Sequence, residues 1–97
     1  MTELVVIRAE NDRSLVGEMT RLIEFLDRVS GVALEDVAYT CSLLQGGSVI
    51  AIIAEDVPSL RARLFSARSR IENGNVLRLR DKSGTYYFRD HLLGDLP

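Results

Sequence analysis

The sequence predicts a small α+β domain, in which about three helices pack on a sheet of three to four strands. In three segments, apolar residues recur at steps of three and four, the spacing of an amphipathic helix. Short β-branched or aromatic runs stand before, between and after these segments, which gives the order β-α-α-β-α-β-β. A chain of 97 residues is long enough for one domain with a single core.

The first half of the chain predicts one strand and two helices. The run LVVI at 4–7 is typical of a buried strand, and Asn11 then stands where a helix N-cap belongs. The apolar stripe of the first helix comprises Leu15, Met19, Leu22, Leu26 and Val29, with Val16 and Ile23 beside it. The apolar face of the second, shorter helix comprises Leu34, Val37, Ala38, Cys41 and Leu44. We expect Gly46-Gly47 to end this helix, because glycine readily adopts the positive φ found there.

The second half predicts a central strand, a third helix and a hairpin. SVIAIIAE at 48–55 is apolar on both faces, so we expect a central strand in a covered sheet. Asp56 is the predicted cap of the third helix. The stripe of that helix is Leu60, Leu64, Ala67 and Ile71. Strands at 76–80 and 85–90 flank the turn-forming run DKSG, and 91–97 is an exit segment.

Composition and charge exclude several classes of function. A formal net charge of −2 argues against nucleic acid as the main partner. The longest apolar run, Val49–Ala54, is far shorter than the roughly 20 residues needed to cross a bilayer. Charge also comes too early in MTELVVIRAEND for a signal peptide. With one cysteine and no internal disulfide, we expect a soluble, cytoplasmic protein that binds neither membrane nor nucleic acid.

The lone cysteine and the lone histidine are the candidates for catalysis. A nucleophilic thiol needs a base and a lowered pKa, but Cys41 falls in the second half of its helix on the apolar face, which favours a buried core thiol. His91 stands beside Asp90, yet no serine or cysteine is placed by a motif to use it, and one histidine cannot build a zinc site. We therefore predict no catalytic residue, no cofactor and no metal.

The third helix carries four arginines in RARLFSARSR. Helical spacing places Arg61 and Arg68 on one side of the apolar stripe, and Arg63 and Arg70 on the other. They are either a solvated rim or a basic strip that meets an acidic partner, such as a carrier protein or a neighbouring domain.

The aromatic run at Tyr86, Tyr87 and Phe88 is a second candidate contact surface. Successive side chains on a strand point to opposite faces, so at least one ring should leave the main core. A tyrosine there would suit a domain interface, and core packing with one exposed ring is an equally good interpretation.

A family resemblance enters at LEDVAYT, Leu34 to Thr40. This stretch resembles the L-x-D-V-A-Y-T segment of the linker domain between ketosynthase and acyltransferase in modular and iterative polyketide synthases. The preceding helix with Leu22, Phe25 and Leu26 and the following hydrophobic strand are similar as well, so the resemblance covers most of the chain. The closing SGTYYFRDHLLGDLP looks like the segment leading into an acyltransferase, above all in iterative synthases of the enediyne or polyunsaturated-fatty-acid kind. The family often has an arginine after the glycine that follows A-Y-T, and a His-Arg pair before the next strand. In this chain residues 46–48 lead directly into Val49, so the loop is shorter and lacks these contacts.

The resemblance implies a non-catalytic interdomain linker spanning 1–97, cut from a larger multidomain transferase, with 91–97 leading toward the acyltransferase. Such a domain has a small sheet with helices on one side and fixes the distance and angle between the flanking ketosynthase and acyltransferase. It also forms one wall of the cleft where an acyl carrier protein docks. Asp36, Tyr39 and Thr40 would make helix-end and interdomain hydrogen bonds.

Two alternatives to a linker domain stay open. One is a free-standing protein-binding module that recognises an acidic partner through its arginine-flanked third helix. The other is a small enzyme that uses Cys41 or His91.

Overall fold

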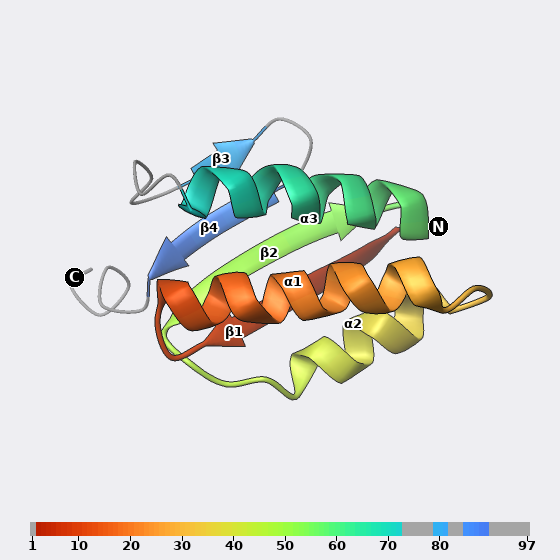
Figure 1. Ribbon diagram of the computed structural model, residues 1–97, viewed down its shortest axis with the longest axis horizontal. Helices are drawn as coiled ribbons and strands as arrows, with labels where there is room; N and C mark the ends of the chain where they lie inside the picture. The colour runs from red at the N-terminus through yellow and green to blue at the C-terminus, as the bar shows by residue number, and fades with distance from the viewer. Residues whose placement is uncertain (1, 73–78, 82–84, 90–97) are drawn as a thin grey trace.

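The protein folds into a four-stranded antiparallel sheet with helices on one face and along one edge. The computed structural model describes residues 2–72, 79–81 and 85–89. Its elements are β1 (Glu3–Ala9), α1 (Asp12–Arg28), α2 (Leu34–Ser42), β2 (Ser48–Ala54), α3 (Val57–Glu72), β3 (Leu79–Asp81) and β4 (Thr85–Arg89). In the sheet the strands lie in the order β1-β2-β4-β3. Helices α1 and α3 lie side by side across one face, and α2 lies along β1 (Figure 1). The predicted α+β class is confirmed.

The core lies between the sheet and the helices. β1 and β2 pair over their full lengths, from Glu3 opposite Ala54 to Ala9 opposite Ser48. Alternate residues of both strands face the helices and are buried, among them Ile7 and Ile50. From the helices, the core takes in Leu15, Met19, Ile23, Leu26, Val37, Cys41, Leu60, Leu64, Ala67 and Ile71.

The second face of the sheet departs from the sequence-based expectation. β2 is central, as predicted, but it is not covered along both faces. On the face opposite the helices, the cross-strand pair Leu4 and Ile53 is 55% and 38% exposed, while Val49 is buried. Apolar residues on both faces thus identified a central strand, but they did not require a second layer over its whole length.

The predicted caps of α1 and α3 are present. Asn11 Oδ1 accepts a hydrogen bond from the Ser14 amide at 2.8 Å, and Asp56 Oδ1 accepts one from the Ser59 amide at 2.8 Å. These bonds satisfy amides that have no partner within the helix. α1 ends at Arg28, so Val29 is the residue after the helix and is 40% exposed instead of continuing the buried stripe.

The end of α2 was predicted wrongly. The helix ends at Ser42, and Leu43 caps it with right-handed backbone angles. Gly46 does have a positive φ, +143°, but it serves a different purpose. A Cβ atom on Gly46 would lie 2.1 Å from the carbonyl oxygen of Ala9, so only glycine lets this loop cross the end of β1.

Candidate functional site

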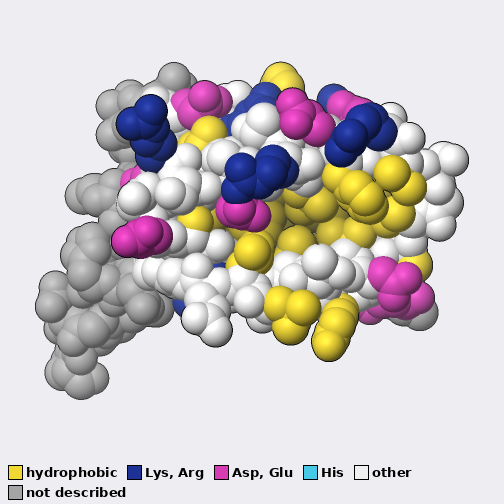
Figure 2. Space-filling view, turned by 60° about the horizontal axis from the view of Figure 1, so that its bottom comes forward, with side chains coloured by type: hydrophobic (Ala, Val, Ile, Leu, Met, Phe, Trp, Pro, Cys, Tyr) yellow, Lys and Arg dark blue, Asp and Glu magenta, His cyan; other side chains and the backbone are white. Residues whose placement is uncertain are grey.

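A hollow on the described surface lies between α1 and α2. Figure 2 shows apolar side chains gathered in a depression on this face, with charged side chains at its border. The depression has a volume of about 390 Å³, which is within the range of pockets that bind ligands or bulky side chains. We call it the α1–α2 groove. Its lining comprises Ile7, Glu18, Arg21, Leu22, Phe25, Val32, Asp36, Val37, Thr40, Cys41 and Leu44.

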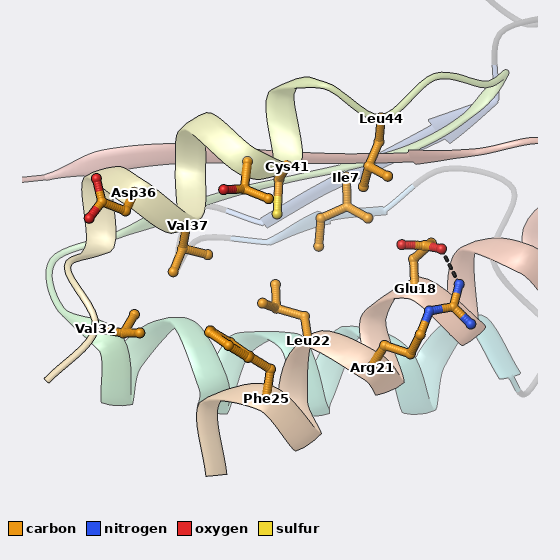
Figure 3. A pocket seen from close by; sticks show the side chains of 11 residues that line it. Ile7, Glu18, Arg21, Leu22, Phe25, Val32, Asp36, Val37, Cys41 and Leu44 are labelled. Carbon is orange, nitrogen blue, oxygen red and sulfur yellow. Dashed lines mark hydrogen bonds and ion pairs between the residues drawn. The ribbon is translucent and has the colours of Figure 1, made fainter. Parts of the chain in front are cut away.

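The walls of the groove come from two helices whose faces do not close on each other. In Figure 3, Leu22 and Phe25 point from α1 toward Val37 and Cys41 of α2. Leu22 is only partly buried and Phe25 is exposed, although both stand beside core residues. Apolar surface therefore stays in contact with solvent along the seam, which is typical of a surface that binds something.

Cys41 lies in the groove wall, and its burial as a core thiol is confirmed, with 8% of the residue exposed. Burial first, and the negative charge of Glu18 second, raise the pKa of the Cys41 thiol to about 11. A thiol that attacks a substrate needs the opposite shift, since only the thiolate is nucleophilic. The groove therefore contains a cysteine suited to packing.

Polar groups stand at the two ends of the groove. Glu18 and Arg21 form an ion pair at one end, and Asp36 lies at the other (Figure 3). Arg21 thus already has a carboxylate partner. Asp36 has no ion pair among the residues that the structure describes. The charges of the lining sum to −1, so the border of the groove is acidic.

Two exposed apolar residues lie beside the groove. Tyr39 of α2 and Leu43, which caps the helix, are four positions apart, and helical spacing puts both next to Asp36 and Thr40. Tyr39 is 68% exposed and Leu43 is 64% exposed. Both residues lie outside the groove lining.

The seam between α1 and α3 is built differently. Arg61 of α3 donates to both carboxylate oxygens of Asp27 of α1, at 2.5 Å from Nε and 3.0 Å from Nη2. This pairing lowers the pKa of Asp27, chiefly through the hydrogen bond. Arg68 donates to Thr20 Oγ1 of α1 at 3.2 Å. The guanidinium groups of Arg61 and Arg68 also lie 6.0 Å and 5.0 Å from the centre of the Phe65 ring, within cation–π range.

Arg63 of α3 faces the end of β2 instead of α1. Arg63 donates to the carbonyl oxygen of Ile53 at 2.5 Å and to Glu55 at 3.1 Å, at the end of β2. Arg70 is exposed in the last turn of the helix. The predicted division is seen for three of the four arginines, since Arg61 and Arg68 lie on the α1 side and Arg63 lies on the other.

The structure therefore separates the predicted contact residues into two groups. Asp36, Tyr39 and Thr40 lie on α2, whereas the arginines lie on α3, and α1 runs between the two helices (Figure 1). Tyr86 and Tyr87 belong to β4, but their side chains lie outside the described residues. His91 and the segment 91–97 lie outside them as well.

The groove was not predicted from the sequence. Leu22 was placed in a core stripe and Val32 was given no role. The sequence did contain one indication of the groove. The apolar face of α1 includes Phe25 and Leu22 as well as Leu15 and Ile23, and it is too wide to be covered by a single neighbouring element. Which part of such a face stays open depends on where α2 packs, and periodicity does not contain that information.

Two further properties concern residues 2–72, 79–81 and 85–89. Within them, no three His, Cys, Asp or Glu side chains gather closely enough to hold a metal ion. None of the helices described there combines the length and the apolar character that a membrane span requires.

The comparison of sequences points to polyketide synthases. No family model matches the chain. Atrochrysone carboxylic acid synthase of Passalora fulva is 32% identical to it over 73 residues, which cover 73% of this chain and 4% of the synthase. The chain thus corresponds to a small part of that relative.

Solved structures point the same way. The acyltransferase domain of the iterative polyketide synthase in enediyne biosynthesis matches 91% of this chain with a TM-score of 0.78 and 26% identity, over 24% of its own length. The module 1 ketosynthase of the bacillaene synthase from Bacillus amyloliquefaciens FZB42 shares the fold, with a TM-score of 0.77 and 18% identity, over 98% of this chain and 16% of its own. The module 8 acyltransferase domain of the salinomycin synthase matches 71% of this chain and 17% of its own, with a TM-score of 0.65 and 22% identity. The chain is homologous to a segment of polyketide synthases.

Proposed function

We propose that this chain acts as a non-catalytic linker domain of a polyketide synthase. In this role it holds a ketosynthase and an acyltransferase at a fixed distance and angle. Residues 1–97 form the linker and 91–97 lead toward the acyltransferase. The cytoplasmic location expected from the sequence remains a prediction.

The observation that carries this proposal is the way the fold recurs in two kinds of enzyme. A domain of this shape occupies 24% of a chain named for its acyltransferase and 16% of a chain named for its ketosynthase. These two enzymes perform different chemistry, so a piece that matches a minor share of both is unlike the catalytic core of either. A segment that stands between the two domains, and is retained with each, accounts for both matches.

The chemistry of the described residues supports the same role. The pKa of the Cys41 thiol is raised, which opposes nucleophilic attack at neutral pH. The exposed polar residues of LEDVAYT lie on α2, where Asp36 and Thr40 border the groove. Surface side chains next to unburied apolar walls are suited to contact with another domain.

A replacement experiment in a related enzyme tests this role. The segment of the enediyne acyltransferase protein that matches this fold is deleted in one variant and replaced by this chain in another. We expect the deletion to abolish soluble expression and acyl loading, and the replacement to restore both. A Gly46→Val replacement chain, which cannot form the loop over β1, is the matched control. Full loading activity in the deletion variant would contradict the proposal, as would acyl transfer by the isolated 97-residue chain.

A second candidate role is recognition of an acidic protein, such as an acyl carrier, through α3. The observation that favours it is Phe65, which is 48% exposed and flanked by two guanidinium groups. An exposed aromatic ring among arginines is typical of an interface. Against this, Arg61 and Arg63 already pair with Asp27 and Glu55, which reduces the charge available to a partner.

Titration with an acidic carrier protein separates the two roles. If α3 is the docking surface, combined Arg61→Ala and Arg68→Ala substitutions should weaken binding about tenfold or more, because two charges and the support of Phe65 are lost. The matched control is Arg13→Ala, which removes an exposed arginine of α1. Binding that ignores the double substitution would exclude this surface.

A further inference from the structure

The α1–α2 groove is the strongest unassigned feature of the molecule. It combines an apolar floor and walls with an acidic border, and the side chains described around it do not fill it. We propose that the groove docks a polypeptide segment that inserts one bulky apolar side chain and carries a lysine or arginine beside it.

The apolar anchor follows from the walls. Ile7, Leu22, Val37 and Cys41 present carbon and sulfur atoms toward one another across the opening (Figure 3). None of them offers a strong hydrogen-bonding group, so the occupant gains stability there by burying apolar surface. A space of about 390 Å³ is large enough for an aromatic or leucine side chain with part of its neighbour.

The basic flank follows from the charges at the border. Arg21 is the only cation in the lining, and Glu18 already pairs with it. Asp36, at the other end, has no ion pair among the described residues and is exposed. An anionic occupant, such as a fatty-acid carboxylate or an acidic peptide, would meet a net negative border, whereas a lysine or arginine would give Asp36 a partner.

Exposed apolar residues beside the groove favour a polypeptide over a small molecule. Tyr39 and Leu43 lie outside the groove lining, next to Asp36 and Thr40 at its border, and each is more than 60% exposed. A small ligand in the pocket would leave both in water, whereas an extended or helical segment would cover them after anchoring.

A peptide library tests the inference with the 97-residue chain. The chain is panned against a phage-displayed library of random dodecapeptides, and synthetic peptides from convergent clones are titrated by fluorescence anisotropy. We expect the clones to share one tryptophan, phenylalanine or leucine next to lysine or arginine. Asp36→Lys should weaken their binding about fivefold, because it reverses the charge that meets the basic flank. Glu24→Lys is the matched control, since it makes the same charge change on α1 outside the groove lining, and it should leave binding unchanged.

A second variant blocks the groove without touching the core. Thr40 is exposed on α2 and lines the groove, so Thr40→Arg should fold normally by circular dichroism and lower peptide affinity at least tenfold. Convergence on acidic peptides, or no convergence at all, would overturn the inference, as would binding that is insensitive to both groove variants. Saturable binding of decanoate in the groove, or self-association that Thr40→Arg abolishes, would overturn it in favour of a lipid or a second copy. The inference rests on the groove alone and not on the linker role. If this chain restored activity to the deleted synthase but the library gave no convergent peptides, the docking inference would be refuted and the linker role would still stand.

Discussion

The two flanks of α1 show two ways in which a helix meets a neighbour. Toward α3, the seam is closed by fully buried leucines and bordered by the Arg61–Asp27 pair and the Arg68–Thr20 bond. Toward α2, the seam stays open over Leu22 and Phe25, and its one ion pair, Glu18–Arg21, lies within α1. Bonds between helices mark the flank that is complete within this chain. Among the described residues, no ion pair joins α1 to α2, and this is the flank where we propose that a polypeptide segment docks.

The largest difference between the flanks should appear when one leucine is truncated on each. Leu64 is fully buried on the inner side of α3, so Leu64→Ala should lower the free energy of unfolding by about 3 kcal/mol through lost burial and an internal cavity. Leu22 is partly buried and already faces a hollow, so Leu22→Ala should cost only about 1 kcal/mol. Urea denaturation of both variants measures the difference. Equal losses would mean that the groove wall is packed as tightly as the core.

The residues on the inner side of the fold could therefore be predicted from the sequence. Stripes at helical spacing identified Leu15, Met19 and Leu64 as core residues, because a buried face repeats with the period of its own element. Asn11 and Asp56 were found as caps for the same reason, since their hydrogen bonds join residues three positions apart. Local rules predict local contacts well.

The groove and the side-chain interactions that join α1 to α3 could not be predicted from the sequence. Asp27 and Arg61 are 34 positions apart, and no spacing rule links them. Gly46 shows the same limit, because its need for glycine comes from Ala9, on a strand far earlier in the chain. Which flank of α1 stays open depends on the position that α2 takes after the loop that precedes it. This position is set by tertiary packing and not by a local sequence pattern. Sequence resemblance, in contrast, indicated the polyketide synthase homology that the comparisons support.

The reactivity of Cys41 gives a second test of the open flank. Because its pKa is raised to about 11 from an ordinary value of 9.0, roughly a hundredfold less thiolate is present near pH 8 than for a free cysteine. Iodoacetamide should therefore alkylate the folded chain about a hundredfold more slowly than the chain unfolded in urea, as followed by mass spectrometry. Glu18→Gln should speed the reaction of the folded chain, since it removes the second cause of the shift. A folded rate equal to the unfolded rate would show that α2 leaves the thiol open to solvent.

A smaller effect is expected from the ion pair that joins α1 to α3. The pKa of Asp27 is lowered below its ordinary value of 3.8 by the Arg61 hydrogen bond, so the pair stabilises the fold above that pH and its contribution is lost as pH falls below it. Asp27→Asn should lower the urea midpoint slightly at pH 7, and this effect should shrink as the pH falls below 3.8. The effect is small because both side chains are more than 40% exposed. Asp36→Asn, on the open flank, is the control and should change the midpoint less at pH 7. If Asp27→Asn lowered the midpoint as much at pH 2 as at pH 7, the pairing would not be its cause.

The smallest effect should come from filling the groove slightly. Thr40→Leu adds apolar atoms to the groove wall, and it should raise the free energy of unfolding by about 0.5 kcal/mol through burial and better helix propensity. Ser66→Leu makes a comparable change at an exposed position of α3, outside the groove, and should gain only the propensity part. The difference between the two variants in urea denaturation therefore isolates the burial that the groove offers. A gain no larger for Thr40→Leu than for Ser66→Leu would mean that the open flank of α1 behaves as ordinary surface, and the contrast with its closed flank would then lie in charge alone.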